Sequence, residues 1–337
     1  MTLICTICIA NYNGIKFIDS CLSSIANQSI NISHEIIIHD DASTDGSADY
    51  IYSNYPNVEL IRSSKNVGFC ISNNRMAKRA KGRYLLFLNN DATLFPNALE
   101  TMYKYSLQYR NAIIGLPQYD ANTNEFIDAG SSLDIFLNPI PNPLPETPTS
   151  VGMIIGACLW IPKNTWNEIG EFPPLFNTLA EDMYLCCAAR LKGHPSIALH
   201  ESGFFHWVGK SIGGGKVQKN KLKTSLYRRS LSERNKTFVM ITTYPTALLC
   251  LILPLHIVSL IFEGLLLSLI KMNPILLKEI YFHSIIEIWN ERLNLLSMRK
   301  KTLDLKKISV FNYFSTFQLL PHKFRMLIKH GLPHISI

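Results

Sequence analysis

The chain has 337 residues, 47% of them hydrophobic and 17% charged, and its mean hydropathy is +0.10. This length provides a sizeable core, and this composition excludes a polytopic membrane protein while leaving membrane contact open. The formal net charge of +8 is placed unevenly, since Lys and Arg crowd residues 210–234 and 292–325, and we assign this basic charge to an anionic membrane surface rather than to nucleic acid.

The eight cysteines are scattered along the chain. Cys5 and Cys8 lie in an apolar run that reads as a strand, where side chains three apart point to opposite faces, so no zinc site is expected there. We expect eight free thiols that are buried or semi-buried, and free thiols are typical of a reducing compartment. The first ten residues lack the basic region of a signal peptide and read as a first strand, so we expect the chain to start in the cytoplasm.

Short apolar runs alternate with amphipathic helical patterns over the first 117 residues. The runs predicted as strands are residues 3–10, 35–39, 58–62, 84–88 and 112–116. Each run is too short for a helix and too continuous for a half-exposed strand, as expected in a parallel sheet covered on both faces. The alternation predicts the α/β class, with a helix that carries Pro96 in its first turn and extends through Gln108.

Polar clusters follow the first four predicted strands, at residues 11–14, 40–46, 65–68 and 89–91. Each cluster alone also reads as a turn or a helix cap. Because ligands bind beyond the carboxyl ends of the strands in open α/β sheets, four clusters on one rim indicate a binding site.

A nucleotide sugar explains this set of residues. A pyrimidine base presents an N–H donor that Asp40 or Asp41 can accept, and a diphosphate needs a cation. Asp91 follows the rigid, buried strand YLLFL and would lie at the edge of the sheet. A carboxylate at this edge suits a divalent metal that bridges two phosphates.

The motifs ICIANYNG, IIIHDDASTDGS, SKNVGFCISNN, YLLFLNNDA, GACLWIPK and GEFPPLFNTLAEDMYLCCAARLKG, with the later HWVGKS and ERN, resemble the inverting glycosyltransferases of family 2. The resemblance covers residues 1–240 and implies the GT-A fold, a mixed and mainly parallel sheet that binds a nucleotide-diphosphate sugar. The NVGF and HWVGKS contexts are similar to bacterial rhamnosyltransferases of O-antigen and capsule assembly. This likeness implies dTDP-L-rhamnose as the first choice of donor, a UDP-hexose as the second, and as acceptor a growing glycan linked to a polyprenyl diphosphate.

The resemblance also implies roles for individual residues. The donor site would comprise Ala10, Asn11, Tyr12, Asp40, Asp41, Asn66, Asn74, Asn89 and Asn90. Asp91, Asn89 and His206 would hold Mn²⁺ or Mg²⁺. Asn89 stands where the family often has a second Asp, and a neutral amide should lower the metal affinity.

Glu181 and Asp182 open an amphipathic helical pattern. Taken alone, two exposed acids there would complement the helix dipole, which is worth under ~1 kcal/mol. The resemblance implies instead that one carboxylate takes the proton from the acceptor hydroxyl during an in-line displacement. We favour Asp182 as this base and leave Glu181 to hold the acceptor, to orient the base or to exchange roles with Asp182.

The glycines at 213–215 match neither common phosphate-loop spacing, so we expect a flexible loop or lid. Lys210 and Lys216 of this loop would then meet the diphosphate, or else form a solvated basic loop.

The composition changes beyond Phe238, where residues 246–270 form an apolar segment long enough to cross a bilayer. Pro254, His256 and Glu263 oppose a simple span, because a carboxylate in a membrane is costly unless it is paired. Basic stretches follow at 299–301 and 306–307. We predict a catalytic domain over residues 1–240 and a helical, membrane-associated region over 241–337. This region would dock on anionic headgroups either as a kinked or re-entrant helix or as interfacial helices, and the alternative is a helical pair packed on the catalytic domain or on a partner chain.

We therefore expect an inverting glycosyltransferase at the cytoplasmic face of the inner membrane, held peripherally or by one inserted segment. A nucleotidyltransferase acting on sugar phosphates would carry a Gly-rich basic loop after the first strand, and residues 11–16 are a poor match. A non-catalytic membrane scaffold would have no reason to retain Asp41, Asp91 and Asp182 together, and loss of donor binding would reveal it.

Overall fold

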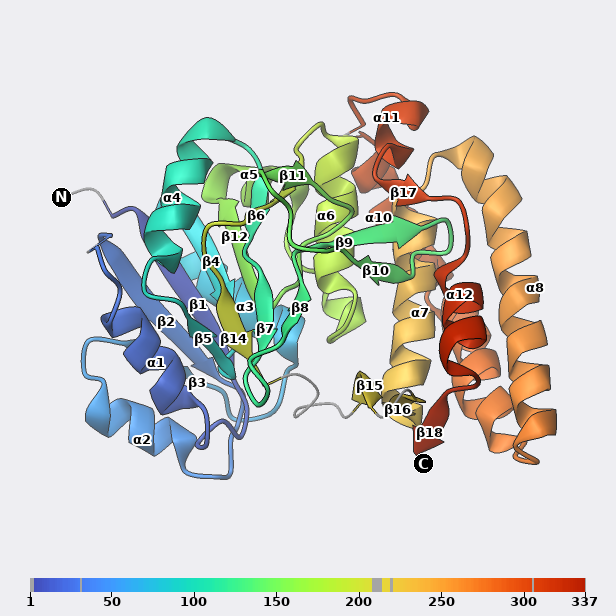
Figure 1. The fold of residues 1–337 in the computed structure, drawn as a ribbon, viewed down its shortest axis with the longest axis horizontal. Coiled ribbons are helices and arrows are strands. Elements are labelled where there is room, and N and C mark those ends of the chain that lie inside the picture. The colour runs from blue at the N-terminus through green and yellow to red at the C-terminus, as the bar shows by residue number, and fades with distance from the viewer. Residues whose placement is uncertain (1–2, 31, 208–213, 219–220, 305, 337) are drawn as a thin grey trace. The chain divides into compact units, whose positions relative to one another are not determined.

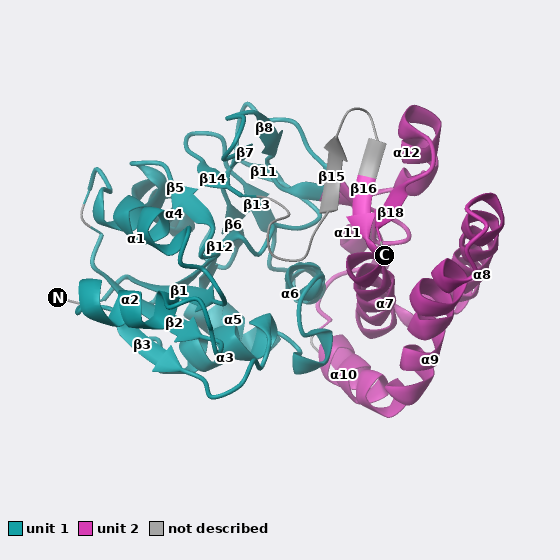
Figure 2. Cartoon of the chain, turned by 90° about the horizontal axis from the view of Figure 1, so that it is seen from below, with its two compact units in different colours: residues 1–131, 141–207 teal, residues 132–140, 208–337 magenta. Residues whose placement is uncertain are grey.

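The computed structural model describes residues 3–30, 32–207, 214–218, 221–304 and 306–336. The chain forms two compact units (Figure 2): unit 1 comprises Met1–Ser131 and Pro141–Trp207, and unit 2 comprises Ser132–Ile140 and Val208–Ile337. The boundary between the two units lies near residue 207, whereas the composition of the sequence changes near residue 240. The helix Leu226–Thr243 begins between these two points and packs with the helices that follow it, so it belongs to unit 2.

An eight-stranded sheet forms the centre of unit 1 (Figure 1), in the order β11-β13-β6-β12-β4-β1-β2-β3. Its strands are β1 (Cys5–Asn11), β2 (His34–Asp40), β3 (Glu59–Arg62), β4 (Tyr84–Leu88), β6 (Ile113–Gly115), β11 (Thr149–Ser150), β12 (Cys158–Pro162) and β13 (Ser196–Ala198). β1 pairs in parallel with β2 and β4, whereas β12 runs antiparallel between β4 and β6. The mixed, mainly parallel α/β sheet is thus confirmed.

All five strands expected from the apolar runs are present, with ends shifted by up to two residues. Every residue of β4 is buried, and Tyr84 stacks on Trp160 of β12 at 5.1 Å between ring centroids. The apolar run therefore has the central place in the sheet that its composition indicates.

The helices of unit 1 are α1 (Ile18–Ala26), α2 (Ser47–Asn54), α3 (Phe69–Arg79), α4 (Ala98–Gln108), α5 (Lys163–Ile169) and α6 (Glu181–Leu191), with the 3₁₀ turn η1 (Pro174–Phe176). The expectation that Pro96 lies in the first turn of α4 is wrong, because the helix begins only at Ala98. The Pro96 carbonyl instead accepts a hydrogen bond from the backbone N–H of Ser29.

A second sheet of four very short strands has the order β5-β14-β7-β8. Its strands are β5 (Ala92–Leu94), β14 (Phe204–His206), β7 (Gln118–Asp120) and β8 (Phe126–Asp128). β14 pairs with β5 so that His206 lies opposite Ala92, the residue after Asp91. This sheet therefore brings a residue from the end of unit 1 to the end of β4.

Unit 2 is mainly helical (Figure 1). Its helices are α7 (Leu226–Thr243), α8 (Thr246–Ile270), the π-helix η2 (Leu277–Phe282), α9 (His283–Asn290), α10 (Arg292–Asp304), α11 (Val310–Phe314) and α12 (His322–His330). Short strands form two small sheets, β10-β9-β17 and β15-β16-β18. Their bounds are β9 (Ser131–Asp134), β10 (Pro139–Pro141), β15 (Gly214–Gln218), β16 (Lys221–Ser225), β17 (Phe317–Gln318) and β18 (His334–Ser336).

The glycine-rich loop expected at 213–215 is only partly a loop. Gly214–Gln218 form β15, which pairs antiparallel with β16, so the backbone of Lys216 belongs to a strand. Lys210 and Gly213 lie outside the described residues.

The apolar segment 246–270 is one continuous helix, α8, with Pro254 inside it. It is the one helix in the described part of the chain that is long and apolar enough to cross a membrane. Only 22% of its most apolar 18-residue stretch is buried inside the protein. All eight cysteines are free, as expected, and seven of them are buried, but Cys250 on α8 is exposed, contrary to expectation.

Candidate active site

Asn11, the last residue of β1, joins three of the four polar clusters at the sheet rim. Its buried amide donates to Asp40 Oδ1 at 2.8 Å and to Ser47 Oγ at 2.9 Å. Its carbonyl oxygen accepts from Asn90 Nδ2 at 2.9 Å. The ends of β1, β2 and β4 therefore form one hydrogen-bonded rim.

The rim leaves no space for a side chain at position 14. A Cβ added to Gly14 would lie 2.2 Å from both Asn11 Oδ1 and Asn90 Nδ2. A larger residue here would displace the hydrogen-bonded amides of Asn11 and Asn90, because the backbone of the β1–α1 turn approaches them closely.

Asp41 attaches the remaining cluster to the same rim. Its buried carboxylate accepts the backbone N–H of Val67 at 2.7 Å and that of Gly68 at 2.8 Å. Gly68 has φ +88, a conformation that favours glycine. Asp40 is likewise engaged, because its second oxygen accepts the Ser43 N–H at 3.1 Å. Since each carboxylate oxygen can accept two hydrogen bonds, Asp40 and Asp41 both keep acceptor capacity for a base.

The other predicted donor residues differ in their surroundings. Tyr12 and Asn66 are exposed, and Ala10 lies opposite His39 in the β1–β2 pair. Asn74 is buried, and both polar atoms of its amide bond the backbone of Phe172, at 2.8 and 3.1 Å. These bonds give Asn74 a structural role, joining α3 to the segment before η1.

The three predicted metal ligands lie together. His206 Nε2 is 3.2 Å from Asp91 Oδ1 and 3.4 Å from the amide nitrogen of Asn89. Asp91 and His206 are both buried. On the other side of the ring, His206 Nδ1 lies 2.9 Å from the amide of Gln118, which is also buried.

This donor set fits a divalent cation. A carboxylate, an imidazole and an amide oxygen suit Mn²⁺ well and Mg²⁺ less well, and the diphosphate and water would complete the coordination. To bind a cation, Nε2 must present its lone pair, so the ring proton must sit on Nδ1 and the Gln118 amide must accept it. The amide nitrogens of Gln118 and Asn89 both face the ring in this structure, and a half-turn of each amide exchanges its oxygen and nitrogen without moving the rest of the side chain.

Asp128, at the end of β8, is a member of the site that the sequence did not indicate. It lies opposite Gln118 in the β7–β8 pair and is buried, and Ser131 Oγ donates to its Oδ2 at 3.2 Å. Its Oδ1 is buried without a hydrogen-bond partner among the described residues. Burial raises the pKa of Asp128 to about 6, with a further increase from Asp182 that opposes the decreases from Ser131 and His206.

The acid pair predicted to include the base opens helix α6. Glu181 and Asp182 are both buried, so the interpretation that they are exposed acids at a helix end is wrong. Asp182 accepts the Gly156 N–H at 2.9 Å on one oxygen and the Met183 N–H at 2.7 Å on the other. These bonds fix the orientation of the carboxylate.

The loop before α6 has an unusual backbone. Asn177, Leu179 and Ala180 all have positive φ, between 61 and 67°. Such conformations cost about 1–3 kcal/mol each and persist where the surrounding structure enforces them. Asn177 also lies against Gly68, where an added Cβ would come within 1.9 Å of its Oδ1. This loop therefore couples the position of the acid pair to the rim that carries Asp41.

Residues 6–168 match the model of a family described as glycosyl transferase family 2. The chain is 25% identical over 223 residues to TuaG of Bacillus subtilis (strain 168), a glycosyltransferase named for teichuronic acid biosynthesis, and this match covers 65% of the chain and 84% of TuaG. It is 35% identical over 113 residues to a poly(ribitol-phosphate) beta-glucosyltransferase of Bacillus spizizenii, but this match covers only 32% of the chain and 18% of that protein.

Two solved structures share the fold. The structure of S. aureus TarS 1–349 in complex with UDP superposes with a TM-score of 0.53 at 15% identity, over 90% of this chain and 89% of that one. The structure of GalNAc-T7 with UDP, GalNAc and Mn²⁺ superposes with a TM-score of 0.62 at 14% identity, over 99% of this chain and 59% of that one. Both are similar in architecture, which confirms the GT-A fold.

Proposed function

Because residues 6–168 match the model of glycosyl transferase family 2, we propose that this chain is a glycosyltransferase that moves a sugar from a nucleotide-diphosphate donor to a hydroxyl of a growing surface glycan, with inversion at the transferred carbon. One observation carries the proposal: the buried side chains of Asp91 and His206 meet at 3.2 Å, and the neighbouring Asn90 donates to Asn11 of the rim at 2.9 Å. This arrangement supports a cation site directly beside the predicted nucleotide-binding rim.

The rim would bind the nucleotide. Asp40 or Asp41 accepts the N–H of the base, and Asn11 holds the strand ends in register around it. Asp91, His206 and Asn89 would hold a divalent cation, which when bound neutralises negative charge on the departing nucleotide diphosphate.

Asp182 would act as the base. It takes the proton of the acceptor hydroxyl while that oxygen bonds to the sugar carbon and the bond to the nucleotide diphosphate breaks on the opposite face. The backbone N–H groups of Gly156 and Met183 keep the carboxylate aimed during this step. Glu181, the neighbouring buried acid, would hold the acceptor.

The donor is proposed as a UDP-hexose or dTDP-L-rhamnose. UDP is present in the related TarS and GalNAc-T7 structures, which supports the first. The likeness of the NVGF and HWVGKS contexts to rhamnosyltransferases supports the second. Asp40 and Asp41 suit both, because uracil and thymine present the same N–H donor.

The acceptor is proposed as a glycan on a polyprenyl diphosphate at the cytoplasmic face of the membrane. Support comes from the apolar helix α8 and from two similar proteins, one named for teichuronic acid biosynthesis and one named a poly(ribitol-phosphate) beta-glucosyltransferase. Helix α8 would keep the enzyme at the surface where such an acceptor is anchored.

A panel of nucleotide sugars, tested for thermal stabilisation with and without Mn²⁺, examines the proposal. A ligand at 100 times its Kd should add about 2.7 kcal/mol to stability. We expect one pyrimidine nucleotide sugar to stabilise wild type in Mn²⁺, and D91N to lose this effect. Stabilisation by a nucleoside triphosphate with a sugar phosphate would favour a nucleotidyltransferase, and no response to any nucleotide sugar would favour a scaffold.

A further inference from the structure

Helix α8 has a continuous apolar face that the rest of unit 2 leaves uncovered. Six side chains on it are 45–75% exposed: Leu251, Leu255, Val258, Phe262, Leu265 and Leu269. Their spacing of three and four residues places them in one stripe along the helix, about 27 Å long. Soluble monomers rarely expose an apolar patch of this extent, so the stripe calls for a partner.

The opposite face of α8 is packed inside unit 2. Leu260 and Leu267 join Ile280 and Tyr281 in a small core. A Cβ added to Gly264 would lie 2.6 Å from the Tyr281 ring, so α8 and η2 approach closely at this glycine. The helix is thus fixed to its unit along one side.

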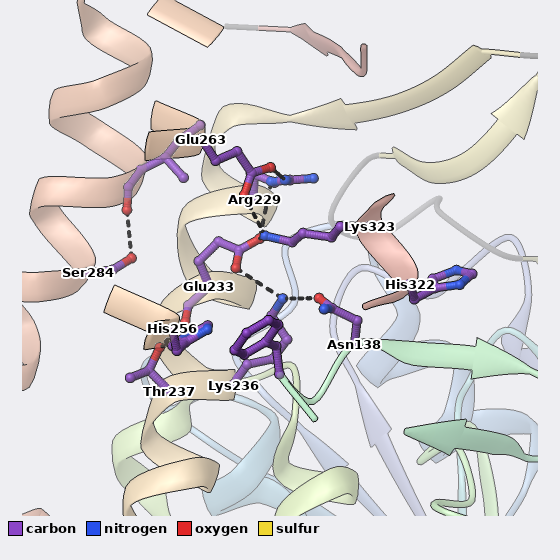
Figure 3. A network of polar contacts seen from close by, with 12 residues as sticks. Asn138, Arg229, Glu233, Lys236, Thr237, His256, Glu263, Ser284, His322 and Lys323 are labelled. Carbon is purple, nitrogen blue, oxygen red and sulfur yellow. Dashed lines mark hydrogen bonds and ion pairs between the residues drawn. The ribbon is translucent and has the colours of Figure 1, made fainter. Parts of the chain in front are cut away.

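Glu263 fastens the same side through charge (Figure 3). Its carboxylate pairs with Arg229 of α7, and Lys323 of α12 lies 2.7 Å from its second oxygen. The sequence made a simple membrane span costly because of the charge of Glu263. In the structure this charge is neutralised by partners within unit 2.

The cluster around Glu263 extends deeper into unit 2 (Figure 3). Glu233 of α7 lies 2.8 Å from Lys323 and 3.0 Å from Lys236. Lys236 also donates to Asn138 Oδ1 at 2.6 Å. Arg229, Glu233 and Lys236 share one face of α7, so this cluster ties α8 to a charged helix.

These attachments decide how α8 can meet a bilayer. If α8 crossed the hydrocarbon core, it would carry the charged α7 with it or leave Glu263 without its partners, and both are costly. If α8 lies in the plane of the surface, only its outer stripe enters lipid and every ion pair stays intact.

The charge of unit 2 indicates the kind of surface. Residues 132–140 and 208–337 hold 20 of the 33 Lys and Arg side chains but only 7 of the 25 Asp and Glu, a net +13, whereas unit 1 holds 13 against 18, a net −5. Lys271, directly after α8, is exposed. A strongly basic unit with an apolar stripe complements anionic headgroups above acyl chains.

We propose that α8 is an in-plane membrane anchor, which inserts its outer stripe into one leaflet of an anionic bilayer while the Glu263 cluster holds its inner side to unit 2. This inference deepens the membrane location in the proposed function. It differs from a transmembrane helix in that both ends of α8 stay on the same side of the membrane.

Vesicle binding tests the stripe. The full chain should sediment with vesicles of phosphatidylcholine and phosphatidylglycerol and bind less to vesicles of phosphatidylcholine alone. Added salt should weaken its binding to the anionic vesicles. F262D should lower the partition coefficient about tenfold or more, because it places a charge in the stripe. The matched control is L107D, which alters an exposed leucine on α4 of unit 1 and should bind as wild type does.

Topology tests the in-plane orientation. Cys250 is the exposed cysteine, so an NBD-maleimide label can be placed there selectively, and the C250S/I270C variant moves the label to the other end of α8. With protein added outside sealed vesicles, external dithionite should quench both labels. Protection of either label would show a span and overturn the proposal.

Other outcomes also overturn it. If the lipid-free chain is an oligomer that F262D dissociates, and vesicles do not bind it, the stripe is an interface between copies. Nucleotide-sugar binding, measured on the same preparations, separates the two proposals: an anchor without donor binding would contradict the proposed function alone, and donor binding without vesicle binding would contradict the anchor alone.

Discussion

Replacing Asp128 by Asn should stabilise unit 1 at pH 8 and change its stability little at pH 4. The buried carboxyl has a pKa of about 6, whereas an Asp in the unfolded chain titrates near 3.9. The folded state therefore binds this proton more tightly. Below pH 4 both states are protonated and the group costs nothing, and between pH 4 and 6 the unfolded state loses its proton first, so wild-type stability falls.

The size of the effect follows from the same difference. About two pKa units correspond to roughly 3 kcal/mol of destabilisation in wild type above pH 6, which D128N would largely remove. The amide keeps an oxygen for the hydrogen bond from Ser131, so the variant loses little of the local structure.

Urea unfolding at pH 4, 6 and 8 measures this difference. Tryptophan fluorescence follows mainly unit 1, because three of the four tryptophans lie in this unit and two of them, Trp160 and Trp166, are buried there. D49N serves as the control, because the Asp49 side chain is 80% exposed and pairs with Arg62 only at the surface. A difference between D128N and wild type that is the same at all three pH values would refute the reasoning, since it would not come from a titrating carboxylate.

Four other substitutions test the site. D182N should reduce turnover by roughly 10²–10⁴-fold and leave the donor Kd unchanged. Loss of donor binding would instead show that α6 is a structural support. N89D should tighten Mn²⁺ binding, measured by calorimetry on the protein without substrates. An unchanged affinity would show that Asn89 is not a metal ligand. Q118M should weaken Mn²⁺ about 10–100-fold through misorientation of His206, with wild-type affinity as the contradicting result. G14A should destabilise the fold by about 1–3 kcal/mol in urea, because its Cβ would meet Asn11 and Asn90, and a neutral effect would mean that the rim relaxes.

The sequence by itself determined five of the eight strands in the main sheet of unit 1 and the polar rim that follows them. Strands such as β1 and β4 are continuous apolar runs bounded by turn residues, and both signals are local. The rule that the carboxyl ends of parallel strands share one edge then placed residues 11–14 and 89–91 on one rim, and the hydrogen bond between Asn90 and Asn11 at 2.9 Å shows that these two clusters meet.

Only the tertiary structure decided which residues surround His206. The strands that carry His206, Gln118 and Asp128 have three residues each, too few for a periodic pattern. The side chains of Gln118 and His206 meet although the two residues are 88 positions apart in the sequence. The partners of Glu263 could not be predicted either. The sequence shows its charge within an apolar segment, but Arg229 and Lys323 lie 34 and 60 residues away from it in the sequence. A local pattern reports the surface that one element buries, whereas the partner of a buried charge depends on where the chain returns after folding, and no local pattern encodes that.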